Sequence, residues 1–428
     1  MSNQLSVIQK RLVQRRAAEK RFRLYGLMAI ALAGLILLTL GTSIVSKGYS
    51  AFYQTYMVLD VTLEESRIDP DGQRDVAKLE AVSSSKYRAL VRSALQDAFP
   101  EVEGRRELRK LFGIAGAGSD RNVKEYVLDN PGEIGTTVRI AMKVSDDVDS
   151  YFKGYIDRTL PEDDRRVKDQ ELAWLDTLEA EGRIETHFNT DFFVNADSRE
   201  PEDAGIRGAL VGSFLTLLVT LTLSFPIGVL TAIYLEEFAP KNRWTDVIEV
   251  NINNLAAVPS IVFGLLGLAV FLGVFGLPRS APFVGGMVLA LMTLPTIIIA
   301  ARAALKAVPP SIREAALGMG ASRVQVVFHH VLPLAMPGIL TGTILGMAQA
   351  LGETAPLLMI GMVAFIADIP GSFTDAATVL PVQIFLWADA PERAFVEKTS
   401  AAIIIILLFL FAMNALAVLL RKRFERRW

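Results

Sequence analysis

The sequence predicts a membrane protein of the all-α class, with six transmembrane helices and one α+β domain inserted after the first of them. Hydrophobic residues make up 51% of the 428 residues, and the mean hydropathy of +0.36 is too apolar for an ordinary soluble chain. Long apolar runs alternate with charged segments, as expected for membrane spans joined by loops. A charged stretch of about 160 residues, long enough to bury its own core, follows the first run.

The composition excludes several classes of function. The formal net charge is only −2, so we expect no nucleic-acid partner. The chain has no cysteine, which excludes disulfides, thiolate catalysis and cysteine-ligated metal. It has three histidines, so we expect no histidine-based zinc site. The dipeptide Gly-Lys of a P-loop does not occur, so this chain is not expected to be an enzyme that hydrolyses ATP.

The distribution of charge predicts the topology. The run at 24–45 is too long for a cleaved signal peptide and long enough to cross about 30 Å of hydrocarbon. Six spans place both basic ends on the cytoplasmic side of the cell inner membrane, by the positive-inside rule. The predicted parts are a basic cytoplasmic N-terminus at 1–23, a transmembrane helix at 24–45, an extracytoplasmic α+β domain at 46–207, a membrane core at 208–420 and a basic cytoplasmic tail at 421–428. The core is expected to hold helices at 209–234, 251–277, 283–300, 336–361 and 399–420, with a cytoplasmic loop at 309–333.

Hydrophobic periodicity predicts the elements of the 46–207 domain. Met57, Leu59, Val61 and Leu63 alternate with other side chains, which predicts a strand, and Thr136–Val144 alternates in the same way. Helical spacing predicts helices at 86–99, 105–112 and 166–181.

The loop at 309–333 has the sequence of a structured helix–turn–helix element. Ser311 with Glu314, and Ser322 with Gln325, are spaced as capping boxes that begin two short helices. Gly320 permits a bend between them. Leu332-Pro333 is expected to end the second helix. A plain connector would be polar and poor in helix, so we interpret the loop as a docking element.

Glu353 is the one ionisable residue in the apolar run at 336–361. Burying a carboxylate in a bilayer costs at least about 2.5 kcal/mol, so we expect Glu353 to face a packed seam rather than lipid. It shares a helical face with Gly346 and Gln349, and Gly338, Gly342 and Gly346 allow another helix to approach closely. Glu353 either bonds a neighbouring helix or lies on a substrate path, and both interpretations remain open.

The third apolar run offers neutral polar groups. Ser260 and Asn254 are candidates for the same path, and bundle packing is an equal alternative for both. Pro259 is expected to kink this span.

Four stretches of the sequence resemble motifs of known permeases. Glu314-Ala315-Ala316, Gly320 and Leu332-Pro333 resemble the "EAA" loop of ABC-importer permeases. Gly352-Glu353-Thr354-Ala355-Pro356 resembles a signature of the phosphate-transport permeases, and the stretches 232–237 and 254–268 resemble the same subfamily. Gln349 stands where members commonly have Arg.

The resemblance implies a PstA-type subunit with the type I ABC-importer permease fold, which translocates inorganic phosphate. It implies a homologous second permease (PstC-type), a cytosolic ATPase dimer (PstB-type) that uses the ATP, and a periplasmic phosphate-binding protein (PstS-type), with membrane lipids around the chain and no cofactor in it. The residues implied in ATPase coupling are Glu314, Ala315, Ala316, Gly320, Leu332 and Pro333. The residues expected on the substrate pathway are Glu353, Gln349, Thr354, Ser260 and Asn254.

Phosphate chemistry is compatible with a carboxylate on the path. Phosphate has a pKa near ~6–7 and keeps a proton on part of its population, which a carboxylate can accept in a hydrogen bond, whereas sulfate offers none. The alternatives are an ABC importer for another oxyanion, an ion-gradient-driven secondary transporter with Glu353 as proton carrier, and a membrane-anchored receptor built around the 46–207 domain.

Overall fold

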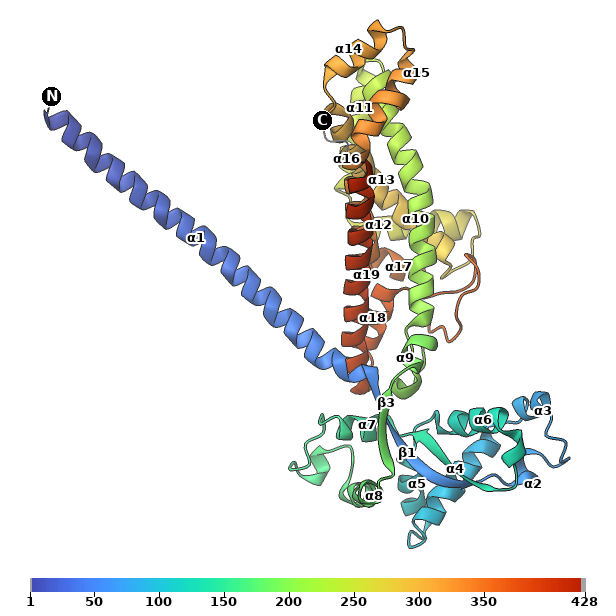
Figure 1. Cartoon of the computed structure of the whole chain (residues 1–428). Coiled ribbons are helices and arrows are strands. Elements are labelled where there is room, and N and C mark those ends of the chain that lie inside the picture. The colour runs from blue at the N-terminus through green and yellow to red at the C-terminus, as the bar shows by residue number, and fades with distance from the viewer. Residues whose placement is uncertain (1, 425–428) are drawn as a thin grey trace.

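The computed structural model describes residues 2–424 and shows an elongated helical bundle with a small α+β domain at one end (Figure 1). Five helices are long and apolar enough to cross a membrane, and a bent helix pair makes a sixth span. This multi-pass membrane architecture confirms the predicted fold class. The last residues of the predicted basic tail, 425–428, lie outside the described part of the chain.

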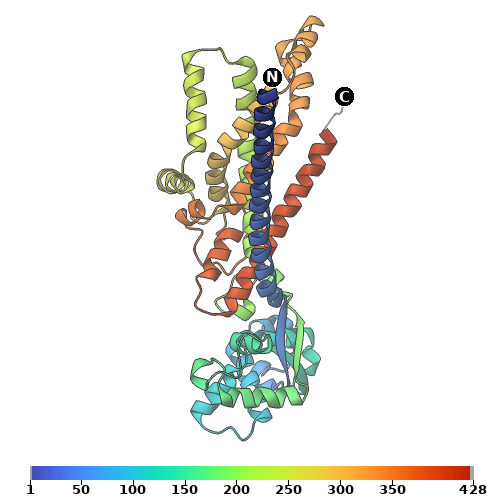
Figure 2. The same cartoon turned by 90° about the vertical axis from the view of Figure 1, so that its left-hand side faces the viewer.

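The bundle is built from long helices continued by π-helical segments. Its helices are α1 (Ser2–Gly48), α10 (Arg207–Ile233), α11 (Arg243–Ala256), α12 (Ser260–Leu266), α13 (Pro282–Lys306), α14 (Pro310–Gly318), α15 (Arg323–Gln325), α16 (Leu332–Gly352), α17 (Ala355–Met359), α18 (Leu380–Ala388) and α19 (Ala394–Phe424). The π-helical segments are η5 (Tyr234–Phe238), η6 (Gly267–Val274) and η7 (Val326–Val331). The far ends of α1 and α19 lie toward the end of the molecule that carries α14 and α15, opposite the α+β domain (Figures 1 and 2).

α1 meets the bundle only near its C-terminal end. A Cβ on Gly48 would come within 2.8 Å of Ala401 N, so the backbones of α1 and α19 are in close contact there. Toward its N-terminal end α1 diverges from the bundle (Figure 1).

The centre of the bundle is the packing of α13 between α10 and α16. Small residues allow α13 and α16 to approach closely. A Cβ added to Gly338 of α16 would lie 2.7 Å from the Cβ of Ala304 of α13, and a Cβ added to Gly342 would lie still closer to the Cβ of Ala300. The predicted close approach along Gly338, Gly342 and Gly346 is therefore present at the first two positions. At Gly346 the nearest atoms are 3.8 Å away, which is ordinary contact.

This difference predicts opposite outcomes for two glycine substitutions on one helix face. We expect Gly342→Ala to destabilise the protein by about 1–3 kcal/mol, because the new methyl group overlaps the Ala300 side chain and forces α13 and α16 apart. Gly346→Ala is the matched control and should be tolerated. Thermal unfolding in detergent compares them, and equal midpoints would contradict the packing described.

Two predicted spans are wrong as continuous helices. The span 251–277 is instead α11 and α12–η6, which meet at an angle of 104°, with α12–η6 seen end-on in Figure 2. Pro259 lies at the break as the N-cap of α12, which confirms the predicted kink, since proline cannot continue the helical hydrogen-bond ladder. The span 336–361 stops at Gly352, because Pro356 has no N–H to give the Gly352 carbonyl.

The α+β domain contains a three-stranded antiparallel sheet with strand order β2-β1-β3. β1 (Tyr53–Thr62) pairs Leu59 with Ile140 of β2 (Thr137–Lys143) and Thr55 with Thr186 of β3 (Ile184–Phe188). The strands and the three helices expected from periodicity are present, and Met57, Leu59, Val61 and Leu63 are all buried. The domain helices are α2 (Glu65–Ile68), α3 (Val76–Glu80), α4 (Ser84–Ala98), α5 (Arg105–Gly113), α6 (Ser119–Asp129), α7 (Asp146–Phe152) and α8 (Asp169–Ala180), with 3-10 turns η1 (Tyr49–Phe52), η2 (Pro131–Glu133) and η3 (Glu162–Asp164).

A buried ion-pair cluster fastens this domain to the segment that leads into α10. Lys143 of β2 is 1% exposed, and its Nζ donates to Asp203 at 2.7 Å and to Asp191 at 2.5 Å. These two acids lie in η4 (Pro201–Asp203) and α9 (Asp191–Val194). The neighbouring Glu202 accepts a hydrogen bond from Ala117 N at 2.8 Å. The sheet is thus held to the segment that leads into α10 by two ion pairs to a buried lysine.

Glu202 gives this attachment a pH dependence. Burial raises the pKa of its carboxyl to about 7, well above the usual 4.5. The folded state therefore binds this proton more tightly than the unfolded state. The protonated Glu202 stabilises the folded state fully below pH 4.5, and this stabilisation is lost as the pH rises through 7. The corresponding change in the free energy of unfolding is on the order of 3 kcal/mol.

We expect Glu202→Gln to remove most of this pH dependence, because the amide keeps an acceptor for Ala117 N–H and cannot ionise. The midpoint temperature of the first thermal unfolding transition should decrease from pH 5 to pH 8 in the native chain. In the variant this decrease should be much smaller. Parallel pH profiles for the two proteins would contradict the role of Glu202.

Candidate functional site

The loop between α13 and α16 is a helix–turn–helix, although its first cap differs from the prediction. The predicted Ser311–Glu314 capping box is wrong: Pro309 is the N-cap and Pro310 already starts α14, which leaves Ser311 inside the first turn. Gly320 has a φ of +85°, a conformation that favours glycine, and it makes the expected bend. The Ser322–Gln325 capping box is confirmed, with Ser322 N donating to Gln325 Oε1 at 2.9 Å.

The second helix does not end at Leu332-Pro333, as the sequence predicted. The π-helical segment η7 joins α15 directly to α16, so that Arg323–Gly352 is one helix of 30 residues. Pro333 is accommodated in the first turn of α16, where the wider turns of η7 precede it. The loop and the fifth span therefore form one continuous element.

The predicted coupling residues divide between a packed face and a free face of the loop. Ala316 is buried against Val326, Val327 and Val331 in the cluster that also contains Leu305 of α13. Leu332 and Pro333 are half-buried, whereas the other three predicted residues, Glu314, Ala315 and Gly320, are exposed.

Large apolar side chains are exposed on the same loop, and the sequence analysis missed them. Met319 is 78% exposed, and Leu317, Val324 and Phe328 are exposed as well. Together with Glu314 they form a mixed apolar and acidic surface at the end of the molecule, which we name the loop surface. Several large apolar side chains exposed on one short element are a feature of many protein interfaces. The sequence signal was available, since Leu317 and Met319 are apolar residues in the segment between two predicted spans.

Arg313 anchors α14 to the bundle. Its Nη2 donates to Glu237 Oε1 at 2.6 Å and its Nε donates to the same carboxylate at 3.1 Å, a two-pronged pair with η5. Its Nη1 and Nη2 also donate to the carbonyls of Val308 and Leu305, at 2.7 and 2.9 Å. One side chain therefore joins the first loop helix, the end of α10 and the end of α13.

A second set of charges extends this anchor. Arg302 of α13 pairs with Glu249 of α11 at 2.5 Å and with Glu236 of η5 at 3.5 Å. Lys306 lies 3.6 Å from the same Glu236. These ion pairs give the adjacent acids Glu236 and Glu237 a structural role that their sequence motif did not reveal. The base of the loop is thus fixed to three membrane helices.

Two of the five expected substrate-pathway residues, Glu353 and Thr354, lie at the break between α16 and α17. Glu353 has extended backbone angles (φ −78°, ψ 124°), and Thr354, the N-cap of α17, follows it directly. Both are half-buried, and Gln349 is exposed one turn earlier on α16. The predicted helical face joining Gly346, Gln349 and Glu353 is therefore wrong at Glu353, because the helix ends before it.

A second broken helix packs against this break. A Cβ on Gly264 of α12 would come within 2.7 Å of Pro356 Cα, so α12 and α17 touch through their backbones. Ser260 begins α12 and is half-buried, while Asn254 lies on α11, beyond the 104° bend, and is exposed. Within residues 2–424 no hydrogen bond joins the five predicted side chains. Irregular backbone at membrane depth is tolerated only where it is buried in protein or lines a wet cavity.

The comparisons identify the class of protein. Residues 224–428, which contain the loop and both breaks, match the family described as the binding-protein-dependent transport system inner membrane component. Residues 9–162 match a domain of unknown function (DUF3333). The membrane part of the chain is therefore a permease component of a transport system and not its ATP-hydrolysing component.

Two named relatives show to which family of permeases the chain belongs. The chain is 30% identical over 223 residues to phosphate transport system permease protein PstA 1 of Mycobacterium tuberculosis, covering 52% of this chain and 72% of the relative. It is 30% identical over 224 residues to phosphate transport system permease protein PstA of Haemophilus influenzae, covering 52% and 78%. The chain belongs to this family of PstA permeases. Among solved structures, the MetNI methionine ABC transporter aligns with 52% of this chain and 96% of its own, at 17% identity and a TM-score of 0.39.

Proposed function

We propose that this chain is the membrane-spanning subunit of an ATP-driven importer that moves inorganic phosphate across the cell inner membrane. The observation that carries the proposal is the half-buried Glu353 at the break between α16 and α17, in a chain whose relatives are named phosphate permeases. Discontinuous helices at membrane depth are a common setting for solute sites in transporters. Glu353 and Thr354 are the residues proposed to meet the solute, with Gln349 and Ser260 nearby and Asn254 at the margin.

The proposed partners follow from the two ends of the molecule. The loop surface would dock on a cytosolic ATPase dimer (PstB-type), which binds and hydrolyses the ATP, while this chain needs no cofactor. A homologous second permease (PstC-type) would complete the membrane pore, and a periplasmic phosphate-binding protein (PstS-type) would deliver the solute. Both chain ends would then be cytoplasmic and the α+β domain periplasmic. The position of that domain opposite the loop supports this orientation.

The mechanism we propose begins at the loop. ATPase closure displaces α14 and α15, and the Arg313–Glu237 pair carries that displacement into α10 and α13. The continuous helix from Arg323 carries it to Gly352, next to Glu353. Access to the break then alternates between the two sides of the membrane.

The deciding experiment measures ATP hydrolysis by the reconstituted four-component complex with a panel of oxyanions. We expect phosphate with its binding protein to stimulate hydrolysis, and sulfate to fail. Stimulation by another oxyanion alone would favour the importer for that solute. Solute uptake by this chain in vesicles without an ATPase would instead establish the ion-gradient alternative.

Loss of the loop bend should release the ATPase. We expect Gly320→Val to lower ATPase co-purification strongly, because a β-branched residue at φ +85° is strained by at least about 1–2 kcal/mol and redirects α15. Glu314→Lys should act at the same contact by reversing an exposed charge. Gly132→Val is the matched control, since that glycine lies in the α+β domain with open space around it. Full ATPase recovery with both loop variants would contradict the docking assignment.

A further inference from the structure

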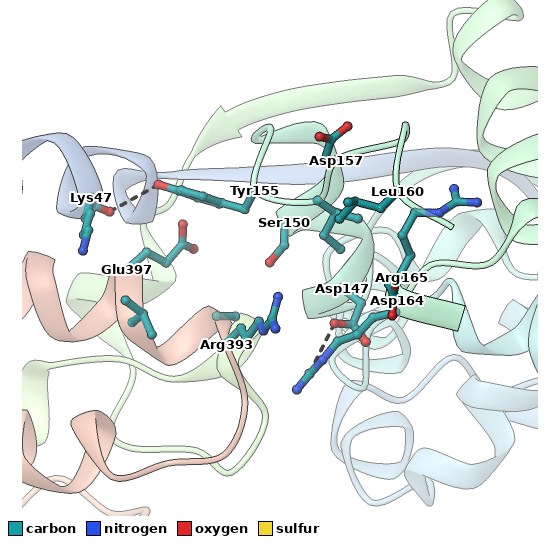
Figure 3. Close-up of a pocket in the computed structure, with 14 residues that line it drawn as sticks. Lys47, Asp147, Ser150, Tyr155, Asp157, Leu160, Asp164, Arg165, Arg393 and Glu397 are labelled. Atoms are coloured by element: carbon teal, nitrogen blue, oxygen red, sulfur yellow. Dashed lines mark hydrogen bonds and ion pairs between the residues drawn. The ribbon is translucent and has the colours of Figure 1, made fainter. Parts of the chain in front are cut away.

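A cavity of about 380 Å³ lies where the α+β domain meets the ends of α1 and α19 (Figure 3). Its volume falls in the range of about 300–1,000 Å³ that small-ligand sites occupy. Lys47, Glu397 and Arg393 stand on one wall, and Asp157, Leu160 and Arg165 stand on the other (Figure 3). The cavity is remote from the loop surface and from Glu353, so the proposed transport function does not use it.

Most of the charges around the cavity already have partners. Glu397 accepts hydrogen bonds from Lys153 Nζ at 2.8 Å and from Ser50 Oγ at 2.7 Å. Asp147 pairs with Arg166 at 3.4 Å, and Arg165 pairs with Asp169. Asp157 accepts from Thr159 N at 2.8 Å, and Asp164 stands beside Arg165 on the far wall.

Lys47 and Arg393 are different from these residues. Both are exposed, and in the described part of the chain neither has a carboxylate within ion-pair distance. Lys47 is in the last turn of α1 and Arg393 directly precedes α19, so the two cations stand at the ends of adjacent helices on one wall (Figure 3). No described carboxylate neutralises either charge, so both cations on this wall are available to an anion.

The mouth is also apolar. Tyr155, Leu160 and Val396 line it and are 48%, 45% and 54% exposed. The apolar span Ala18–Phe52 of α1 ends beside the cavity, and the span Ala394–Leu416 of α19 begins there. Basic residues and aromatic rings at the end of a span are typical of the depth at which lipid headgroups lie. A free anion gains nothing from the exposed apolar side chains, whereas a lipid covers them.

We infer that this cavity binds a membrane phospholipid, with the phosphate group of its headgroup held by Lys47 and Arg393 and its glycerol and upper acyl chains against Leu160 and Val396. The chemistry shared with free phosphate is the phosphate oxyanion, and the level of the cavity favours the lipid. A bound lipid would bridge α1, α19 and the loop 155–166 of the α+β domain.

Native mass spectrometry of the purified full-length protein tests this inference. We expect the unmodified protein to keep a phospholipid adduct through delipidation, and the Lys47→Ala/Arg393→Ala variant to bind re-added phosphatidylethanolamine or phosphatidylglycerol about tenfold more weakly or worse. Lys86→Ala/Arg106→Ala is the matched control, because these exposed cations of the α+β domain do not line the cavity.

A second variant separates loss of binding from loss of folding. Val396→Trp fills the mouth without removing a charge, and it should also lose the adduct. Equal lipid retention in the unmodified protein and in both variants would overturn the inference. Displacement of the lipid from the unmodified protein by millimolar inorganic phosphate would also overturn it, since the cavity would then be a free-anion site.

Discussion

Glu353→Gln is expected to lower phosphate uptake by about 10–100-fold while the complex still assembles. The amide keeps the size of the side chain and loses its negative charge, so it accepts a weaker hydrogen bond from protonated phosphate. Hydrogen bonds to charged groups contribute about 1.5–3 kcal/mol, and each 1.4 kcal/mol corresponds to a factor of ten. Uptake of labelled phosphate by reconstituted vesicles measures the effect.

A control variant and a second oxyanion test whether the loss of uptake is specific to Glu353. Glu80→Gln changes an exposed glutamate of the α+β domain and should leave uptake unchanged. Arsenate, which carries the same kind of proton, should lose uptake in parallel with phosphate. Native uptake by a Glu353→Gln protein that retains its ATPase would remove this residue from the solute path and leave it a packing role.

Arg313→Ala is expected to separate ATP hydrolysis from transport. Arg313 is 22% exposed and its partner Glu237 is 11% exposed, so truncation leaves a largely buried carboxylate and two carbonyl groups without their donor. We expect a loss of about 1–3 kcal/mol in the stability of the loop attachment, with α14 free to move independently of α10 and α13. Uptake should fall at least about tenfold, and ATP hydrolysis should no longer respond to phosphate.

Charge exchange provides the control for this pair. Arg313→Glu combined with Glu237→Arg restores the ion pair but not the hydrogen bonds to Val308 and Leu305, so we expect partial recovery of uptake. Lys241→Ala, a nearby exposed cation, should have no effect. If the double variant is no better than Arg313→Ala, the pair does not transmit the motion.

The sequence was sufficient for features that depend on local chemistry. Alternation at Met57, Leu59 and Val61 predicted β1, and the Ser322–Gln325 cap and the Gly320 bend formed as expected. The proposed role of Glu353 also starts from a local signal, a single carboxylate in an apolar run, and it stays a prediction. Each of these signals lies within a few residues of the structure that it predicts.

The wrong or missing predictions have two causes: contacts between residues far apart in the sequence, and local signals that act against one another. The Arg313–Glu237 pair joins residues 76 positions apart, which a single sequence does not reveal. Pro333 predicted a helix end, but the helix continues through it because the wider π-helical turns of η7 precede the proline. Pro356 had the opposite effect, since it ended α16 at Gly352 and removed Glu353 from the helical face on which periodicity had placed it.

The uninterrupted helix from Arg323 to Gly352 has a mechanical consequence. At 1.5 Å per residue its 30 residues form a rod of about 45 Å, with the loop at one tip and the residue before Glu353 at the other. If the proposed docking at the loop is right, a displacement of α15 along this axis would move Gly352, and with it the backbone at Glu353, in the same direction.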